Sequence, residues 1–259
     1  MTIPRSSAAG PTWLKKIVIL GATSGIAVEI ERLLAQHGLE MLLVARSTER
    51  LAALQSDLGV RGAKQVLTFA ADLAFTQQHV ALNAFVRQNF PDYDTVLLAY
   101  GSMQNPKEAE TSVEVLIDEL HVNFVSASAI LTLFAADLEQ RRNGCIAALT
   151  SVAGERGRRS NYVYGSAKGA LSLFLQGLRS RLHPAGVKVI TIKPGPVQTP
   201  MTDHLRKVDR FANPEVVARD IVRALERRAP DVLYTPWFWR HVMTAVRSIP
   251  ETVFKRLAF

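Results

Sequence analysis

The sequence predicts a doubly wound α/β fold, with one parallel sheet of about seven strands covered by helices on both faces. Short apolar runs alternate with longer amphipathic stretches along the whole chain, and the runs are apolar on both faces, as buried parallel strands are. The chain has 259 residues, of which 48% are hydrophobic and 21% charged, which is ordinary for a soluble globular protein with a full core. We therefore expect one domain over residues 1–259, with an N-terminal arm at 1–14 and an amphipathic tail at 236–259.

The predicted elements follow one another in strict alternation. The expected strands are 16–20, 41–45, 65–71, 95–101, 145–151, 187–194 and 232–234. The expected helices are 26–37, 47–58, a polar stretch ending at Asn89, 111–142, 161–182 and 214–228. Ser47 and the pair Asn213-Pro214 are residue types that begin helices.

Charge and cysteine content limit the partners and the compartment. The formal net charge of +8 is compatible with nucleic acid, anionic lipid or phosphorylated ligands. No nucleic-acid-binding motif occurs, so we expect no nucleic-acid partner; we also expect no metal site. The single cysteine, Cys145, excludes an internal disulfide and suits a reducing compartment. We find no long apolar segment typical of a signal peptide or membrane span, and expect a cytoplasmic protein that can still touch a membrane.

The first predicted strand is followed directly by the sequence GATSGIA, residues 21–27, which opens the first helix. In this context a glycine pattern predicts a dinucleotide site. Gly21 permits the tight turn, and Gly25 lets the backbone approach a pyrophosphate at a helix N-terminus, where free N–H groups favour anions. Thr23 and Ser24 offer hydroxyls and amides to phosphate oxygens. Ala27 replaces the usual third glycine and still allows close packing.

The end of the second strand bears on the choice between the two nicotinamide cofactors. An acidic residue there binds a ribose 2′-hydroxyl, whereas a basic residue accommodates a 2′-phosphate. The stretch reads VARS, with Ala45 at the acidic position and Arg46 after it. NADP(H) is therefore favoured, and NAD(H) stays possible because Arg46 can also be a solvated residue at the start of a helix.

A tyrosine and a lysine with helical spacing point to catalysis. Tyr164 and Lys168 in YGSAK are four residues apart, so they share one helix face, whereas Tyr162 has no lysine at that spacing. A nearby ammonium favours the phenolate and should lower the pKa of Tyr164 from its usual value of about 10. Ser151, at the end of the fifth strand, can hold a substrate carbonyl, and Asn123 can hold a water that links Lys168 to solvent.

This set of residues resembles the short-chain dehydrogenase/reductase family, over nearly the whole chain. The resemblance implies a Rossmann fold, a homodimer or homotetramer, and hydride transfer between nicotinamide and a carbonyl or alcohol, with Asn123, Ser151, Tyr164 and Lys168 as the catalytic tetrad. In the family the segment after the fourth strand reads Asn-Asn-Ala-Gly, whereas here it reads LAYG, residues 98–101. The cofactor contacts that it implies are Gly21, Thr23, Ser24, Gly25, Ile26, Arg46, Asp72, Leu73, Ala99, Gly101, Tyr164, Lys168, Pro194, Gly195, Val197 and Thr199.

Two basic features do not belong to this common set. Arg156, Arg158 and Arg159 lie between Ser151 and Tyr164, where a loop should border the substrate. They can bind an anionic head group such as a phosphate, or simply face water. The tail, 236–259, combines aromatic and basic residues and can lie on a membrane, cover the substrate cleft as a lid, or form a dimer contact.

Three segments also resemble the decaprenylphosphoryl-2-keto-erythro-pentose reductases. They are GERGRRSNYVYGSAK (154–168), whose part between Ser151 and Tyr164 is called the catalytic loop below, KPGPVQTPMTDHL (193–205) after the sixth strand, and WRHVMTAVRSIPETVFKRL (239–257) in the tail. That resemblance implies reduction of the keto group of a polyprenylphosphoryl pentose, in partnership with an oxidase. Two other functions remain open: a reductase of another apolar carbonyl, such as a ketoacyl or sterol-like compound, and a non-catalytic cofactor-binding protein.

Overall fold

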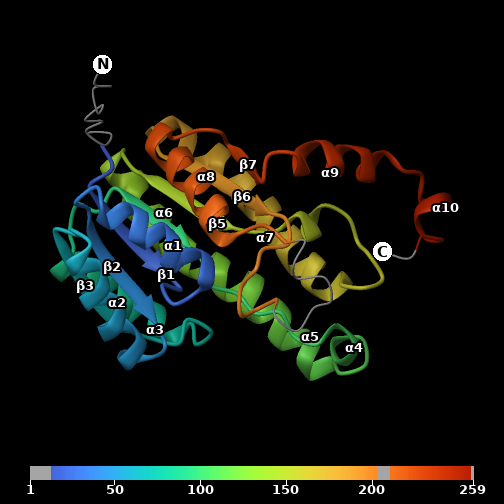
Figure 1. Cartoon of the computed structure of the whole chain (residues 1–259), viewed down its shortest axis with the longest axis horizontal. Helices are drawn as coiled ribbons and strands as arrows, with labels where there is room; N and C mark the ends of the chain where they lie inside the picture. The colour runs from blue at the N-terminus through green and yellow to red at the C-terminus, as the bar shows by residue number, and fades with distance from the viewer. Residues whose placement is uncertain (1–12, 203–210, 258–259) are drawn as a thin grey trace, which may run out of the picture.

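One parallel sheet of seven strands runs through the part of the chain that the computed structural model describes, residues 13–202 and 211–257 (Figure 1). The strand order, β3-β2-β1-β4-β5-β6-β7, confirms the predicted doubly wound fold. The strands are β1 (Lys16–Leu20), β2 (Glu40–Ala45), β3 (Gln65–Ala70), β4 (Thr95–Leu98), β5 (Cys145–Leu149), β6 (Lys188–Pro194) and β7 (Val232–Thr235). Most of the predicted arm, residues 1–12, and the last two residues of the predicted tail lie outside the described residues.

Helices cover both faces of the sheet (Figure 1). On one face pack α1 (Gly25–Ala35), α2 (Thr48–Val60) and α8 (Pro214–Arg227). On the other pack α3 (Gln77–Asn89), α6 (Ala127–Arg141) and α7 (Tyr162–Leu182). The predicted N-caps hold, because the side chains of Ser47 and Asn213 accept hydrogen bonds from the backbone N–H groups of Arg50 and Glu215.

The strands alternate between the two helix layers. In β1, Ile17 and Ile19 pack against α1 and its neighbours, whereas Val18 and Leu20 face the α6 side, and all four side chains are fully buried. Burial of such a side chain contributes about 1.5–3 kcal/mol. Because both faces are covered, β1 is apolar at every position from 17 to 20, which is the pattern that predicted a parallel sheet.

The long helix predicted at 111–142 differs from the structure in its middle. Three consecutive segments form it: α5 (Val113–Leu120), a π-helical stretch η1 (His121–Ser126) and α6. A short helix, α4 (Pro106–Ala109), precedes them and was not predicted. π-helical turns inside α-helices are rare and occur often at functional sites. Here the π-helical stretch contains Asn123.

This helical stretch, Val113–Arg141, is also long and apolar enough to cross a membrane by length and composition alone. The sequence predicts no membrane-spanning segment here. Of its most apolar window 44% is buried inside the protein, and α6 packs on the sheet. The apolar residues of α6 in this stretch are therefore part of the core of the fold.

The carboxyl ends of the strands meet at one edge of the sheet, where the loops of the expected site begin. The strand order reverses between β1 and β4, which is where ligands bind in open α/β sheets. Beyond β7 the tail forms α9 (Trp239–Ser248) and α10 (Glu251–Phe254), which extend away from the sheet toward the loop after β5 (Figure 1).

Candidate active site

Ser151 and α7 are joined by a very close contact between two backbones. Ser151 begins the short 3₁₀ helix η2 (Val152–Glu155), and its hydroxyl accepts a hydrogen bond from the Ala153 N–H at 3.1 Å. A Cβ on Gly154 would lie 2.5 Å from the backbone N of Gly169 in α7. No side chain fits there, so the contact of these two glycines fixes the distance between Ser151 and the helix that carries Tyr164.

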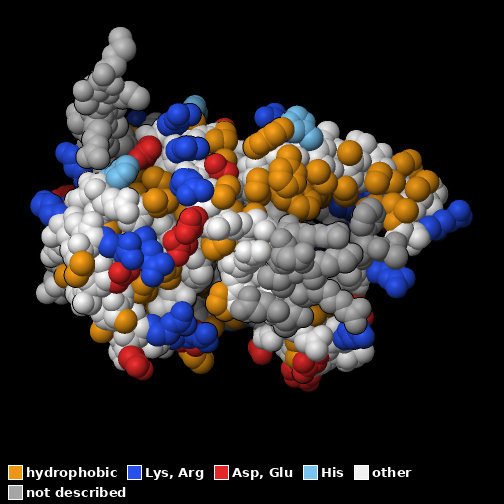
Figure 2. All heavy atoms as spheres, viewed as in Figure 1, with side chains coloured by type: hydrophobic (Ala, Val, Ile, Leu, Met, Phe, Trp, Pro, Cys, Tyr) orange, Lys and Arg blue, Asp and Glu red, His pale blue; other side chains and the backbone are white. Residues whose placement is uncertain are grey.

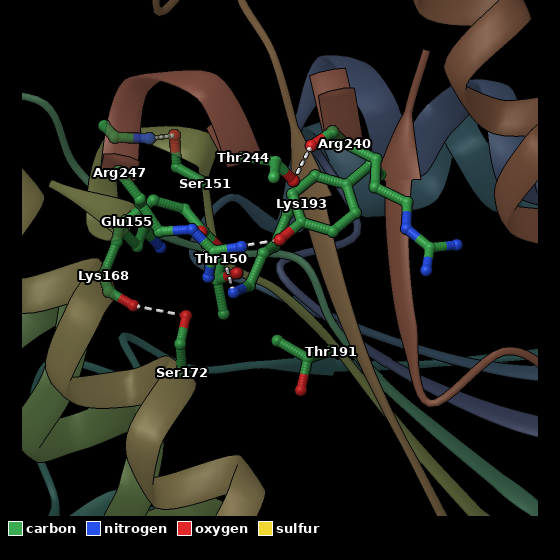
Figure 3. Close-up of polar contacts among 12 residues, drawn as sticks. Thr150, Ser151, Glu155, Lys168, Ser172, Thr191, Lys193, Arg240, Thr244 and Arg247 are labelled. Carbon is green, nitrogen blue, oxygen red and sulfur yellow. Dashed lines mark hydrogen bonds and ion pairs between the residues drawn. The ribbon is translucent and has the colours of Figure 1, made fainter. Parts of the chain in front are cut away.

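Lys168 lies one helical turn beyond Tyr164 and is 4% exposed. Its Nζ lies 5.8 Å from the centre of the Tyr164 ring and donates a hydrogen bond to the Leu149 carbonyl at 3.4 Å. The Lys168 carbonyl in turn accepts a hydrogen bond from the Ser172 hydroxyl (Figure 3). Burial lowers the pKa of Lys168 to about 8, and the charge of Glu119 acts against that change.

The pKa of Tyr164 differs from the expectation drawn from the Tyr–Lys spacing. Burial raises it to about 12, a hydrogen bond with the Ser151 side chain lowers it, and the charge of Glu119 raises it further. Burial is the largest of these effects, because it penalises the charged phenolate. Near neutral pH the phenol is therefore protonated, which is the form that can give a proton to a carbonyl oxygen.

Asn123 is fully buried and joins η1 to the loop after β4. Its Nδ2 donates hydrogen bonds to the Ser102 carbonyl at 3.0 Å and to Glu119 Oε1 at 2.9 Å, and its Oδ1 accepts one from the Ser102 N–H at 3.2 Å. A Cβ on Gly101 would lie 2.6 Å from Asn123 Oδ1 and 3.0 Å from Lys168 Nζ. Glycine at 101 thus allows the amide and the ammonium to reach the same loop.

Glu119 is a buried carboxylate that sequence reasoning missed. It is 1% exposed and accepts hydrogen bonds from Asn123 and from the Gln104 N–H, the latter at 2.9 Å. Burial raises its pKa, and Lys168 lowers it. An acidic residue four positions before Asn123 in the same helix was the one available signal, since that spacing puts both on one face.

The predicted pyrophosphate site, residues 21–27, is called the phosphate turn below, and its backbone packs closely at Gly21 and Gly25. Gly21 has φ +90°, and a Cβ there would lie 2.6 Å from the Tyr100 Cβ. Gly25 packs against Thr199, with an ideal Cβ 3.1 Å from its Cγ2. The Ser24 hydroxyl accepts a hydrogen bond from the Ala27 N–H and so caps α1. A side chain at Gly21 would clash with Tyr100, and one at Gly25 would be crowded by Thr199.

Tyr100 stands in the segment that departs from the family pattern. Its hydroxyl lies 2.7 Å from the Ser126 Oγ, and its side chain packs over Gly21. Burial raises its pKa. The ring thus fills the space between the phosphate turn and η1, and connects the two.

A cavity of about 810 Å³ opens at the carboxyl ends of the strands. Every residue predicted above to contact the cofactor lines it, and Ser151 and Arg158 line it as well. Asn123, Arg156 and Arg159 do not. The structure thus brings three members of the predicted tetrad to one cavity, with Asn123 buried behind the loop after β4.

Two arginines line the part of the cavity that follows β2. Arg46 lines the cavity, as predicted, and Arg50 lines it one helical turn later. The Arg50 guanidinium donates a hydrogen bond to the Thr23 carbonyl at 3.0 Å, which holds it beside the phosphate turn. Arg50 was not predicted, although its place in the first turn after the Ser47 cap was visible in the sequence.

The three arginines of the catalytic loop have different surroundings. Arg158 is partly buried and lines the cavity. Arg159 is exposed. Arg156 turns to the tail, where it donates hydrogen bonds to the carbonyls of Val246 at 2.9 Å and Ile249 at 2.6 Å. The structure therefore gives Arg156 protein partners that account for its charge without a ligand.

These features define the class of protein: a nicotinamide-dependent oxidoreductase on a doubly wound fold. A family model described as short chain dehydrogenase matches residues 15–210, and the chain belongs to that family. It is 34% identical over 241 residues to an uncharacterized oxidoreductase of Mycobacterium tuberculosis, covering 93% of this chain and 96% of the relative. It is 32% identical over 251 residues to an uncharacterized oxidoreductase of Streptomyces coelicolor, covering 96% and 98%.

Solved structures share the fold at lower identity. A short-chain dehydrogenase from Sphingobium yanoikuyae, in complex with NADPH, has a TM-score of 0.80 and 22% identity, covering 95% of this chain and 99% of its own. L-Sorbose reductase from Gluconobacter frateurii, complexed with NADPH and L-sorbose, has a TM-score of 0.76 and 23% identity, covering 87% and 95%. At these identities the likeness shows the fold.

Proposed function

We propose that this short-chain oxidoreductase uses NADP(H) to reduce a carbonyl compound that carries a phosphate group, and that the carbonyl is the 2-keto group of a polyprenylphosphoryl pentose. The observation that carries the proposal is the environment of Arg158. The other residues of the cavity agree with a nicotinamide cofactor and a carbonyl substrate.

The cofactor end of the cavity fits an NADP(H) molecule. Gly21 and Gly25 leave backbone N–H groups at the start of α1 open to a pyrophosphate. Arg46 and Arg50 place two guanidinium groups on the lining where a ribose 2′-phosphate needs them, and Ala45 leaves no carboxylate to repel it. These residues support NADP(H) over NAD(H).

The proposed reaction needs a hydride, a proton and a held carbonyl. Bound NADPH supplies the hydride to the carbonyl carbon. The Tyr164 hydroxyl gives its proton to the carbonyl oxygen, so that an alcohol is formed, and the Ser151 hydroxyl holds that oxygen by a hydrogen bond. Lys168 holds its ammonium beside Tyr164, and Asn123 fixes the loop against which Lys168 lies.

Arg158 is a partly buried cation for which the described residues, 13–202 and 211–257, provide no ion-pair partner. It lines the cavity with Tyr164, and burial alone lowers its pKa. Among residues 13–202 and 211–257 no carboxylate forms an ion pair with its guanidinium. Burial of the Arg158 guanidinium without a negatively charged partner costs free energy. An anionic group of the substrate would offset that cost by pairing with it. A phosphate suits the planar fork of donors.

The tail supports a substrate attached to lipid. Figure 2 shows hydrophobic side chains gathered along α9 and α10, with basic side chains beside them. The exposed apolar residues are Trp237, Phe238, Val242, Val253 and Leu257. An apolar surface with aromatic residues and positive charge binds the interface of an anionic membrane. We propose peripheral membrane contact from the cytoplasmic side, and a homo-oligomer as in the family.

The test is NADPH oxidation with a short-chain prenylphosphoryl 2-keto-pentofuranose, compared with the same sugar lacking the phosphate. We expect turnover that depends on the phosphate and is faster with NADPH than with NADH. Arg158→Ala should raise KM for the phosphorylated sugar by about 10- to 100-fold, as expected for loss of a charge-assisted hydrogen bond of about 1.5–3 kcal/mol. The exposed neighbour gives the matched control, Arg159→Ala, which should leave KM unchanged.

Other outcomes would reject the proposal in distinguishable ways. Equal turnover of the sugars with and without phosphate would contradict the proposed binding of the phosphate by Arg158. Turnover of ketoacyl or sterol-like ketones in place of the sugar would point to a reductase of apolar carbonyls. Cofactor binding without reduction of any carbonyl would leave a non-catalytic protein.

A further inference from the structure

We propose that Trp239 is a substrate-contacting residue that stacks on the ring bearing the reacting carbonyl, and that Arg156 and Glu155 are positioning residues that hold it there. The inference rests on the proposed reductase function, and it deepens that function by naming the shape of the substrate. It predicts a ring with an apolar face, as a furanose has.

Trp239 is where the tail meets the cavity. It is the first residue of α9 and, within the described part of the tail, 236–257, it alone lines the cavity. Tyr164, Ser151 and Gly195 belong to the same lining. Its side chain therefore borders the same cavity as the proposed proton donor and the segment after β6.

The Trp239 indole packs directly on Gly195. A Cβ built on Gly195 would lie 1.9 Å from Trp239 Nε1 and 2.3 Å from Cε2, so even a methyl group cannot be placed there. The Gly195 N–H donates a hydrogen bond to the Thr235 carbonyl at 3.0 Å, which ties the end of β6 to the strand that leads into α9. The edge of the indole that contains Nε1 thus lies directly against Gly195.

The catalytic loop holds the far end of α9. Arg156 donates hydrogen bonds to the carbonyls of Val246, Arg247 and Ile249, the last at 2.6 Å, and pairs with Glu251 at 2.9 Å. Its guanidinium also lies 4.0 Å from the centre of the Phe254 ring. These contacts give hydrogen-bond donors to carbonyls at and just beyond the C-terminus of α9, where the helix itself supplies few.

Glu155 adds a second anchor beside the first. Its carboxylate is almost fully buried and pairs with Lys193 of β6 and with Arg247 of α9 at 3.1 Å, and it accepts a hydrogen bond from the Tyr234 hydroxyl at 2.9 Å (Figure 3). Lys193 lies two residues before Gly195. Glu155, which holds α9, and Gly195, which contacts Trp239, are therefore both connected to β6.

A fixed indole bordering a polar catalytic group selects substrates by shape. Its flat apolar face binds the apolar side of a ring, because stacking buries area that a short chain cannot offer. The hydroxyls of such a ring stay free to meet Ser151 and Tyr164. Loss of the indole should therefore weaken binding of cyclic carbonyls while the cofactor still binds.

The experiment compares Trp239→Ala with the matched control Trp237→Ala, whose side chain is exposed and does not line the cavity. Because Trp237 belongs to the proposed membrane-contacting surface, this control is measured with the two probes that carry no prenyl chain. The probes are the prenylphosphoryl 2-keto-pentofuranose, the cyclic ketone isatin and the acyclic ketone diacetyl. We expect Trp239→Ala to raise KM for the two cyclic probes by about tenfold or more, as expected for loss of a buried aromatic contact. KM for diacetyl should change by less than about twofold, since this acyclic ketone has no ring to stack on the indole, and NADPH should still bind.

A double-mutant cycle tests the positioning residues. Arg156→Ala should also raise KM for isatin, and the double variant with Trp239→Ala should be no worse than Trp239→Ala alone, because Arg156 acts through the indole. Trp239→Phe, which keeps a ring, should recover most of the affinity and shows that the loss is not one of folding.

Three results would overturn the inference. These are an unchanged KM in Trp239→Ala, an equal rise in KM for diacetyl, and additive effects in the cycle. Reduction of isatin without reduction of the keto sugar would contradict the proposed substrate and still test Trp239. A wild-type protein that reduces none of the three probes would contradict both proposals.

Discussion

The Glu119 carboxylate accepts a hydrogen bond from the Asn123 amide at 2.9 Å, which puts a buried negative charge within one helical turn of a proposed catalytic residue. This charge raises the pKa of both Lys168 and Tyr164. Glu119 thus acts against the effect of burial on Lys168 and adds to it on Tyr164. On both side chains the Glu119 charge raises the pKa and so favours the protonated form.

Glu119→Gln should shift the pH profile of carbonyl reduction. Removal of the charge lowers the pKa of Lys168 below about 8 and that of Tyr164 below about 12, so both lose their protons at lower pH. The alkaline limb of kcat/KM should therefore move to lower pH by about one unit, which corresponds to about 1.4 kcal/mol. The control is Asp118→Asn, because Asp118 is the exposed neighbour in the same helix. A shift to higher pH, or an equal shift in the control, would contradict this role.

Tyr164→Phe should lower kcat by about 10²- to 10⁴-fold, the usual contribution of a positioned proton donor. The Kd for NADPH should stay within a few-fold, because the ring still fits its buried place. Steady-state rates and fluorescence titration of the cofactor separate the two effects. Tyr162→Phe is the matched control, since Tyr162 is 42% exposed and begins the same helix. A strong loss in Tyr162→Phe would mean that the wrong tyrosine is assigned.

Arg46→Ala should weaken NADPH binding by about 10- to 100-fold and leave NADH binding nearly unchanged, because only NADPH carries the 2′-phosphate. Arg50→Ala should act in the same direction, since its guanidinium lines the same end of the cavity. Calorimetric titration with both cofactors measures the change. Arg61→Ala, at the far end of the same helix, serves as the control. Equal losses for the two cofactors would exclude a specific phosphate contact.

Two glycine substitutions near and within α7 should change stability in opposite directions. Gly154→Ala puts a methyl group 2.5 Å from the Gly169 backbone and should cost about 1–3 kcal/mol of unfolding free energy. Gly177→Ala, on the exposed face of α7 with no atom within 4 Å of the new methyl, should add about 0.5–1 kcal/mol. Urea denaturation followed by circular dichroism measures both. A neutral Gly154→Ala would show that η2 and α7 can separate.

The sequence predicted the fold and the family, which the sheet order and the family match confirm. The reason is that local patterns carry this information. Apolar runs such as 16–20 are buried on both faces, and GATSGIA directly follows a strand. The pairing of Tyr164 with Lys168 is also a local pattern, because residues four positions apart in a helix lie on the same face.

Other features depend on contacts between distant parts of the chain. The partners of Arg156 lie 90 to 95 residues further along, so its role could not be predicted from the loop that contains it. The lowered pKa expected for Tyr164 was not found, because burial is a property of the packed protein. Glu119 and Trp239 likewise gain their positions only when helices pack together.

The hydrogen bonds between Arg156 and the end of α9 have a consequence for the synthesis of the protein. The ribosome makes the loop around Ser151 long before residues 246–254, so during most of translation the loop has no partner for its arginine. The loop acquires these contacts only after the end of the chain has emerged. A product that is cut short in its last twenty residues would therefore keep the nucleotide-binding strands but lose the contacts that hold its catalytic loop.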